Sequence, residues 1–569
     1  MFEHLPLQLD ELLTWDWEQF APFYQELNER PLTRETLDQW MADWSLIDKH
    51  VSELYNRIYV AVTANTADKE IDKRFDDFMD HIYPQATAAD QKLKDRLLDS
   101  GLEPLNFDVQ LRNMRADREL FREENLALQA QEHKLSNEYD KIIGAQTVEW
   151  EGEEVTVESL TVQYKDTDRA VRQRAWELEM ERRLQDRQAI NENWQKLLKL
   201  RLQIAKNAGF DNYRDYRWKF LKRFDYSPDD SQRFGDAIEE VVVPAANRIY
   251  ARYCRQLGID SLRPWDRYAD TSGRPPLNPF KTVEELRSKT AAIFHQVDPQ
   301  LGGYFDIMIE DNLLDLDNRK NKAPGGYCTD FALAGRPFIF TNAVGIHDNV
   351  QTLLHEGGHS FHVFESAHLP YYAQMEPPME FAEVASMSME FISMPYLTAD
   401  KGGFYNEQEA ARAFLENLDY SILFWPYMAV VDGFQHWVYE NPKDAFDPDQ
   451  CDAVWGRLWD RFMPGEDWSG LEDAKVTGWH RKGHIHAMPF YYIEYGLALL
   501  GAVQVWRNSL SNQAQAVADY RKALSLGGTR TLPELFQTAG ARLAFDAPIL
   551  RESIELMEAT INGLLKKIG

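Results

Sequence analysis

The sequence contains only three cysteines, and they lie far apart, at Cys254, Cys328 and Cys451. An odd, dispersed set argues against a disulfide framework and against a zinc ion held by cysteines. No apolar run reaches the roughly 18–20 residues needed to cross a bilayer, and the acidic N-terminus lacks the basic and apolar regions of a secretory signal. We therefore expect a cytoplasmic protein with no membrane association.

Positive charge and chain-breaking residues are also scarce. The chain has 62 Lys and Arg but 92 Asp and Glu, which gives a formal net charge of −30. Because this charge repels phosphate backbones, nucleic-acid binding is not expected. Gly and Pro together stay below their usual share of about 12%. The length of 569 residues exceeds the roughly 250–300 at which one core stops growing. Together these features predict a mostly α protein with two or more lobes.

Hydrophobic spacing predicts helices over most of the chain. Apolar residues recur at three- and four-residue intervals through residues 1–143 and again in a long helical pair at 166–209. The segment 147–160 instead alternates β-branched and polar residues around a Glu-Gly pair, which predicts a hairpin. We place a boundary there, between an N-terminal helical lobe, residues 1–160, and a catalytic region, residues 161–569.

Residues 336–342 form a short strand-like run that contains Pro337. Because proline has no N–H to give to a neighbouring strand, we expect this run at the edge of a small sheet. A free edge can bind an extended peptide through main-chain hydrogen bonds. The run is therefore a candidate peptide-binding strand.

The segment His355-Glu356-Gly357-Gly358-His359 fits the pattern H-E-x-x-H. Residues four apart share one face of a helix, so His355 and His359 can bind the same metal ion. Glu356 then points to the side of that pair where a general base is needed. His362 is seven residues from His355, about 10 Å along a helix axis, which is too far for the same ion.

A catalytic zinc needs a third protein ligand and an open position. The best candidates lie in residues 376–391, where two prolines precede a helix carrying Glu380, Glu383 and Glu390. Glu383 and Glu390 are two turns apart on one face, beside small residues that allow close helix packing. One of these acids can bind the metal while the other orients a ligand histidine.

These residues resemble the oligoendopeptidase F and thimet oligopeptidase family of zinc metallopeptidases, most closely its bacterial Pz-peptidase-like branch. The resemblance rests on H-E-x-G-H, on an acid 24 residues after the second His within E-x-A-S-x-x-x-E, and on PGGYCTD, RPFIFTN, GHIHAMPFYYIEYGLALLGAVQVW and TLPELFQTAGARLAF. It implies one Zn²⁺ per chain bound by His355, His359 and Glu383, with Glu356 as the base and Glu390 behind the ligands. It also implies a two-lobed helical fold, with a small sheet beside the H-E-x-x-H helix and a deep substrate channel.

The same resemblance implies a His and Tyr cluster that stabilises an oxyanion. On a helix, PFYYIEY would place Tyr491 and Tyr495 on one face with Tyr492 adjacent, so that phenolic donors converge. His484 fits the branch's spacing best, His486 is a rival and His480 a weaker one.

The expected substrates are short oligopeptides. We assign substrate binding to Gly325 and Gly326 of PGGYCTD, to Phe338 and Phe340 of the strand, and to Gly357. Two mid-helix glycines cost roughly 1 kcal/mol each relative to Ala, so each needs a reason. A larger residue is usual at the position of Gly357 in the family, and we interpret this glycine as admitting a bulky group beside the metal.

The sequence thus predicts a zinc-dependent metalloendopeptidase in which Glu356 assists the attack of zinc-bound water on internal peptide bonds. A zinc amide hydrolase acting on small N-acyl or cell-wall-type substrates would share the metal site without needing a peptide-binding edge. A non-catalytic helical interaction protein would bind no metal and would have no reason to keep Glu356 between two ligands. The oligomeric state is left open, a homo-oligomer included.

Overall fold

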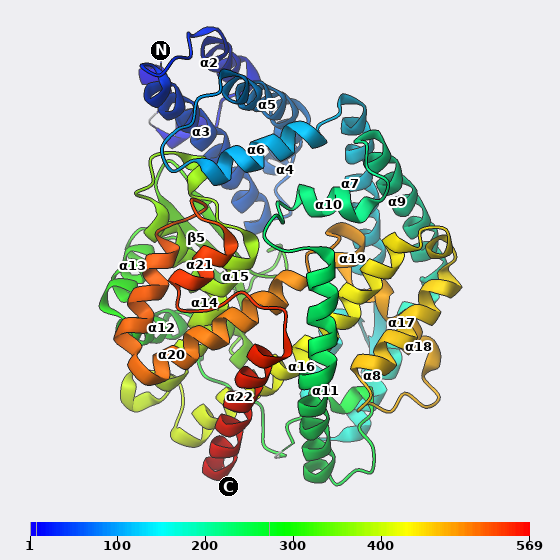
Figure 1. The fold of residues 1–569 in the computed structure, drawn as a ribbon. Helices are drawn as coiled ribbons and strands as arrows, with labels where there is room; N and C mark the ends of the chain where they lie inside the picture. The colour runs from blue at the N-terminus through cyan, green and yellow to red at the C-terminus, as the bar shows by residue number, and fades with distance from the viewer. Residues whose placement is uncertain (1, 7, 272, 569) are drawn as a thin grey trace. The chain divides into compact units, whose positions relative to one another are not determined.

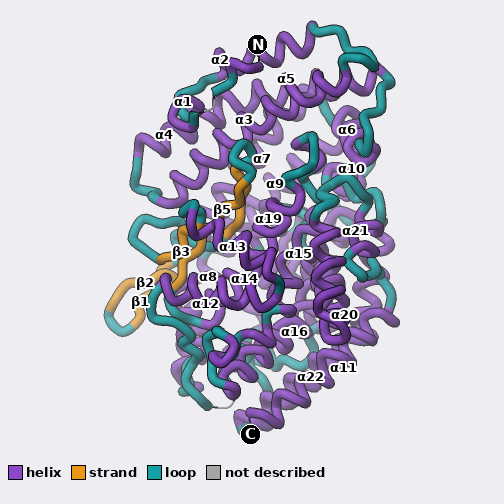
Figure 2. The backbone as a smooth tube through the Cα atoms, turned by 90° about the vertical axis from the view of Figure 1, so that its left-hand side faces the viewer, coloured by secondary structure: helices purple, strands orange, loops and turns teal. Residues whose placement is uncertain are grey.

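The structure is a computed structural model that describes residues 2–6, 8–271 and 273–568. Helices account for 71% of the chain and the described strands form two small sheets, so the fold is mostly α, as predicted (Figure 2). The chain divides into two compact units, each assembled from three segments. Unit 1 comprises Met1–Glu119, Asn278–Ala410 and Ala498–Leu543; unit 2 comprises Leu120–Leu277, Ala411–Leu497 and Ala544–Gly569.

Unit 1 combines a group of N-terminal helices with the helices that surround a three-stranded sheet (Figure 1). The N-terminal helices enclose a core rich in aromatic side chains, Trp40 and Trp44 among them. The helices of unit 1 are α1 (Leu9–Leu12), α2 (Trp17–Glu29), α3 (Leu37–Ala64), α4 (Lys69–Asp77), α5 (Tyr83–Ser100), α6 (Asp108–Leu120), α12 (Val283–Val297), α13 (Pro299–Glu310), α14 (His347–Ser366), α15 (Met379–Ile392) and α21 (Leu532–Thr538).

The sheet of unit 1 has the order β3 (Leu314–Asp317), β5 (Arg336–Ala343), β4 (Tyr327–Phe331). β5 runs parallel to β3 and antiparallel to β4, so it is paired on both sides. The expectation that this segment forms a sheet edge is therefore wrong. Pro337 fits a central strand because the ladder with β3 begins only at Ile339, beyond the proline. The edges of this sheet are β3 and β4.

A tight turn connects β5 to α14 and sets the direction of that helix. Gly345 has a φ of 96°, a conformation that glycine adopts without strain. The side-chain oxygen of Asn349 accepts hydrogen bonds from the backbone N–H groups of Val344, at 2.8 Å, and Gly345, at 3.1 Å. The first turn of α14 is thereby fastened to the end of the sheet.

The two mid-helix glycines of α14 both make room for packing. A Cβ on Gly358 would lie 2.5 Å from the backbone of Ala385 and Ser386 in α15, so this glycine lets the two helices approach closely. A Cβ on Gly357 would lie 2.5 Å from the ring of Phe294, which is fully buried. The assignment of Gly357 to a bulky substrate group is therefore corrected, because a core aromatic ring of α12 occupies that space.

Unit 2 contains the predicted hairpin and a helical array. β1 (Thr147–Trp150) pairs antiparallel with β2 (Glu153–Thr156), and both turn residues, Glu151 and Gly152, have positive φ. The side chain of Ser227 caps the helix that follows it by accepting a hydrogen bond from the backbone N–H of Asp230. The helices of unit 2 are α7 (Glu123–Gly144), α8 (Arg169–Gln185), α9 (Arg187–Asn207), α10 (Tyr213–Phe220), α11 (Pro228–Leu257), α17 (Pro448–Phe462), α18 (Glu472–Val476), α19 (Gly483–Ala487) and α22 (Ala547–Ile568).

Two long helices contribute residues to both units, α16 (Glu407–Glu440) and α20 (Ile493–Leu524). Among the described helices, none has the length and apolar character that a membrane crossing requires.

Candidate metal centre

Helices α14 and α15 bring together one group of side chains that could hold a metal ion. Within the described ranges, the ligand atoms of His355, His359 and Glu383 all lie within 4.8 Å of one another. The Nε2 atom of His355 is 3.4 Å from Oε2 of Glu383, and Nε2 of His359 is 3.7 Å from the same oxygen. The histidines lie one turn apart on α14, and close packing at Gly358 brings the carboxylate of α15 to them.

The protonation equilibria of Glu383 and His359 favour the binding of a cation, whereas His355 holds a proton that a metal ion would displace. Burial alone would raise the pKa of Glu383, but the hydrogen bond from His355 and the two histidine charges hold it at about 2. Burial lowers the pKa of His359 to about 4, which leaves a neutral imidazole free to donate a lone pair. Burial alone would lower the pKa of His355, but the carboxylates of Glu383 and Glu390 raise it well above the usual value.

Residues behind the ligands fix their orientation. Nδ1 of His355 lies 2.8 Å from Oε1 of Glu390, which leaves Nε2 facing Glu383. Ser386 donates a hydrogen bond of 3.1 Å to Oε2 of Glu383. The position of Ser386, within E-x-A-S, is the signal by which the sequence could have identified this contact. Two imidazoles and a carboxylate held in this way match the donor set of a catalytic zinc, in which three protein ligands leave one coordination position open.

Glu356 lies on α14 between the two histidines and is buried. Burial raises its pKa to about 7, while the charge of His355 and a hydrogen bond from the Cys328 backbone act in the opposite direction. A carboxylate with a pKa near 7 can both accept and return a proton at neutral pH. Cys328 itself is on β4, one of the two edge strands of the sheet, so Glu356 lies against that strand.

His362 is buried on α14, edge-on to Phe381, and is not part of the metal group. Neither of its ring nitrogens has a hydrogen-bond partner among the described residues, and burial lowers its pKa to about 3. Its placement agrees with the distance argument from the sequence.

The residues assigned to substrate binding fall into two groups. Gly325 and Gly326 are exposed and lead directly into the edge strand β4. Phe338 packs against Phe331, and Phe340 stacks on Tyr327 with ring centroids 4.9 Å apart; both phenylalanines are buried. This packing contradicts the assignment of these two side chains to substrate binding, because inward-facing side chains of a central strand form core.

In unit 2 the structure brings together His484 and the three tyrosines of the second motif. The centroid of the His484 ring lies 5.9 Å from Tyr491, 5.1 Å from Tyr492 and 6.0 Å from Tyr495. His486 is fully buried, stacked 4.1 Å from Tyr139. His480 is also buried and bonds Asn191. Of the three candidate histidines, only His484 is both partly exposed and in contact with the tyrosines.

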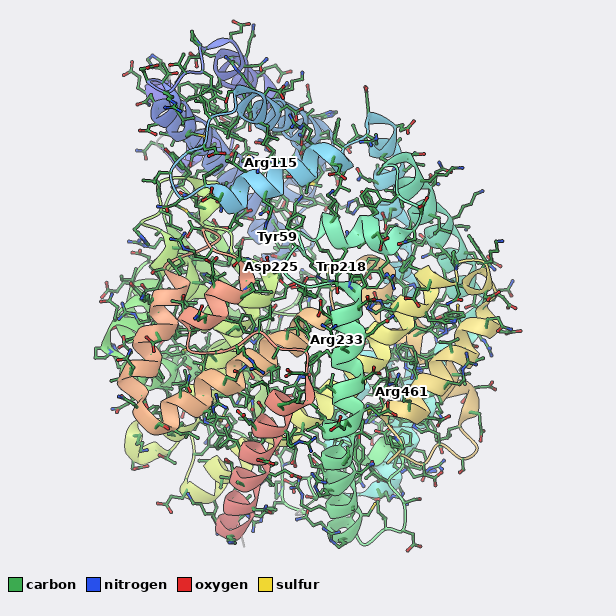
Figure 3. The ribbon with its side chains drawn as sticks, in the orientation of Figure 1. Tyr59, Arg115, Trp218, Asp225, Arg233 and Arg461 are labelled. Carbon is green, nitrogen blue, oxygen red and sulfur yellow. The ribbon has the colours of Figure 1, made fainter. Side chains whose placement is uncertain are left out.

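The sequence predicts that all three tyrosines lie on one helix, but only Tyr495 does. α20 begins at Ile493, so Tyr491 and Tyr492 precede it, and Phe490 adopts a φ of 65°. Gln435 accepts the Phe490 N–H at 2.7 Å and Arg223 donates to its carbonyl at 2.6 Å. Trp218, labelled in Figure 3, packs edge-on against the Phe490 ring. These distant partners stabilise a turn that residue spacing alone could not reveal.

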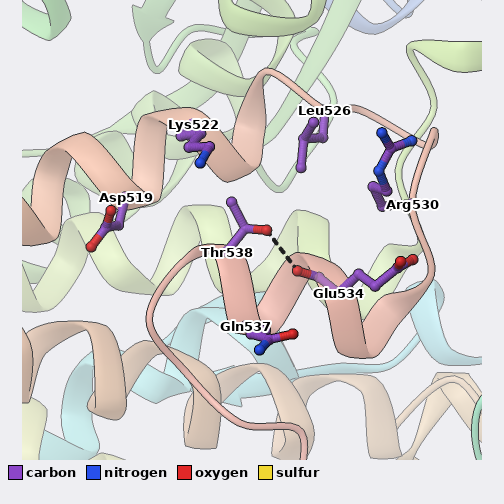
Figure 4. Close-up of a pocket in the computed structure, with 7 residues that line it drawn as sticks. All are labelled: Asp519, Lys522, Leu526, Arg530, Glu534, Gln537 and Thr538. Carbon is purple, nitrogen blue, oxygen red and sulfur yellow. Dashed lines mark hydrogen bonds between the residues drawn. The ribbon is translucent and has the colours of Figure 1, made fainter.

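A hollow of about 460 Å³ lies along α20 and α21, and Figure 4 shows it. Its walls are polar and charged apart from Leu526, and they include none of the predicted site residues. The lining residues are Asp519, Lys522, Leu526, Arg530, Glu534, Gln537 and Thr538.

Comparison with known proteins assigns the chain to a family. The pattern of peptidase family M3 matches residues 162–553, and that of the peptidase M3 N-terminal domain matches residues 11–105. A search of curated proteins gave no significant match.

Several solved structures share the whole fold. A protein assigned as an oligoendopeptidase F superposes with a TM-score of 0.88 at 27% identity, covering 99% of this chain and 98% of its own. PZ peptidase A with an inhibitor gives 0.87 at 27% identity, covering 99% of each chain. A protein from Bacillus anthracis assigned as an oligoendopeptidase F gives 0.83 at 25% identity, covering 98% of this chain and 96% of its own. With the M3 pattern matched over most of its length, this chain belongs to peptidase family M3 and is a peptidase.

Proposed function

We propose that the protein is a zinc-dependent endopeptidase that hydrolyses internal bonds of short oligopeptides. The observation that carries the proposal is the convergence of His355, His359 and Glu383 around one point, with buried Glu356 beside them. Two relatives of similar fold are assigned as oligoendopeptidase F, which supports oligopeptides as the substrates.

The three ligands suit one Zn²⁺ per chain, because His₂Glu is an established donor set of catalytic zinc. When bound, zinc supplies the Lewis acidity that activates water near neutral pH and polarises the scissile carbonyl. Glu390 holds His355 in the tautomer whose Nε2 is free for the metal.

Glu356 acts as the general base and later as the general acid. Its carboxylate takes a proton from the attacking water, and a pKa of about 7 lets it return that proton to the leaving amine. Its burial keeps bulk water away from the transferred proton.

His484 and the tyrosines donate hydrogen bonds to the carbonyl oxygen as it gains negative charge. Burial, with the charge of Lys482, lowers the pKa of His484 to about 4, so the neutral ring donates through its N–H. The phenols of Tyr491, Tyr492 and Tyr495 are the neighbouring donors.

Strand β4 takes over the peptide-binding role first assigned to β5. It is an edge strand, follows the exposed Gly325 and Gly326, and contacts Glu356 through Cys328. An extended peptide added to β4 would therefore pass the general base.

The remaining features follow from the sequence. Along the sequence, the proposed division is a helical lobe, residues 1–160, and a catalytic region, residues 161–569, which the family matches at 11–105 and 162–553 support. The compact units of the fold follow a different division, because they split the first region after Glu119. The negative charge argues against nucleic-acid partners, and the three dispersed cysteines support a reducing, cytoplasmic setting.

The test pairs metal analysis with cleavage of a quenched fluorescent peptide library. Wild type should contain one zinc per chain and cut short peptides at internal bonds. Glu356→Gln should keep the zinc and lose about 10²–10⁴-fold in kcat, while exposed Glu310→Gln should match wild type. Zinc without peptide cleavage, but with hydrolysis of small N-acyl amides, would overturn the proposal in favour of an amide hydrolase.

A further inference from the structure

Arg481 and Lys482 are two adjacent cations of unit 2 that lack an acidic partner within the described part of the chain, which is unusual for a protein with a net charge of −30. Nearby arginines form ion pairs: Arg267 with Glu466, and Arg183 with Glu179 at 2.6 Å. Arg481 and Lys482 form no ion pair with any residue that the structure describes. Both are only partly exposed.

Arg481 makes a single described hydrogen bond, 3.0 Å from its Nη1 to the carbonyl of Ala474. Burial and the charge of Arg183 lower its pKa to about 10. The carboxylate that acts on it electrostatically, Glu179, is already bonded to Arg183 and to Tyr164. Most of the guanidinium donors are therefore available to a ligand.

Lys482 directs its ammonium toward aromatic rings rather than toward an acid. Its Nζ lies 4.0 Å from the centroid of Tyr492 and 5.5 Å from that of Tyr427. Burial lowers its pKa to about 8. Arg481 acts electrostatically on the same Tyr427, so the two cations share a neighbourhood.

Cation–π contacts compensate only part of the cost of burying a charge without a counter-ion. An anion that enters between these groups would complete the site, and the tyrosine hydroxyls would add donors. Peptides carry one suitable anion, the carboxylate, at their C-terminus and on acidic side chains. Tyr492 links this place to the His484 cluster, because its ring contacts both Lys482 and His484.

We propose that Arg481 and Lys482 bind a carboxylate of the peptide substrate and so determine which peptides are cleaved. This inference rests on the proposed function, because it assigns the pair to the same substrate. It predicts a preference for peptides that carry a carboxylate at a fixed distance from the cleaved bond.

The test measures kcat/KM for one parent peptide, its C-terminal amide and its single Glu→Gln analogues. Wild type should prefer one carboxylate form by about tenfold or more, as for a charge-assisted hydrogen bond. Amidation and Glu→Gln replacement distinguish the C-terminal from the side-chain source. Lys482→Met should bring the ratio towards one, mainly through KM, and Lys482→Arg should retain it. Lys196→Met, an exposed lysine of unit 2, is the matched control.

A second readout does not depend on cleavage. Reductive methylation of Lys482 in zinc-loaded Glu356→Gln protein, followed by mass spectrometry, should slow when the carboxylate peptide is added and not when its neutral analogue is added. An unchanged ratio in Lys482→Met, an equal loss on all peptides, or equal protection by chloride would overturn the inference. If wild type cleaves no peptide at all, the proposed function fails instead, and protection alone decides whether the pair binds carboxylates.

Discussion

The metal centre of unit 1 and the His484 cluster of unit 2 are built in different ways. In unit 1, the three metal ligands and Glu356 all lie on two regular helices, and the two ligand histidines are one turn apart on α14. In unit 2, His484 lies on the five-residue helix α19 and two tyrosines lie in a turn with Phe490 at positive φ. Regular helices make a site robust and predictable, whereas the turn depends on distant partners.

The distant partners of the turn are themselves costly to bury. Arg223 pairs with Glu494 at 2.7 Å, and both side chains are nearly inaccessible. A buried ion pair contributes little net stability compared with apolar packing, but breaking it leaves an uncompensated charge. We interpret the pair as fixing the geometry of the tyrosine turn, since Arg223 also bonds the Phe490 carbonyl.

The largest expected effect is loss of the metal ligand from α15. Glu383→Gln should abolish stoichiometric zinc binding and reduce peptide cleavage to background, because a neutral amide is a poor zinc ligand. Zinc content by mass spectrometry and cleavage of a quenched peptide measure both. Retention of one zinc per chain with normal cleavage would contradict the assignment of Glu383.

The cluster of unit 2 should affect chemistry without affecting the metal. Tyr495→Phe removes one phenolic donor and should lower kcat by about 10²–10³-fold if that donor binds the oxyanion. Zinc content should equal that of wild type, which separates this variant from Glu383→Gln. Exposed Tyr83→Phe in unit 1 is a matched control. A change confined to KM would instead assign Tyr495 to substrate binding.

A smaller effect is expected behind the metal ligands. Glu390→Gln weakens the contact to Nδ1 of His355 and should reduce zinc affinity by about 10–100-fold. Competition with a chelator gives the affinity, and excess zinc should restore most of the cleavage. If excess zinc restores nothing, Glu390 has a role beyond orienting His355.

The comparison explains what could be read from the sequence. The pairing of His355 with His359 follows from helix periodicity, whereas periodicity left Glu383 and Glu390 as alternatives and the family resemblance chose Glu383. The Glu151–Gly152 hairpin follows from turn chemistry. The central position of β5 was missed because Pro337 indicates only a missing N–H, not where a neighbouring strand ends. Phe490 was missed because its conformation is imposed by Arg223 and Gln435, more than fifty residues away. Local patterns report local geometry, and tertiary partners decide the rest.

The smallest expected effects concern the glycines of α14, and they test which neighbour each one accommodates. Gly358→Ala would press a methyl group against the backbone of α15, which cannot move aside, and should destabilise the fold by about 1–3 kcal/mol. Gly357→Ala meets the Phe294 ring, which can shift, and alanine recovers roughly 1 kcal/mol of helix propensity, so the net cost should be smaller.

A double-mutant cycle with Phe294→Leu separates the two glycines. Chemical denaturation should show coupling of about 0.5 kcal/mol or more between Gly357→Ala and Phe294→Leu, because the smaller side chain relieves the contact. Gly358→Ala should add independently to Phe294→Leu, since its Cβ meets α15 instead. Equal coupling for both glycines would mean that α14 shifts as a whole. The metal centre would then depend on the packing of α12 as much as on that of α15.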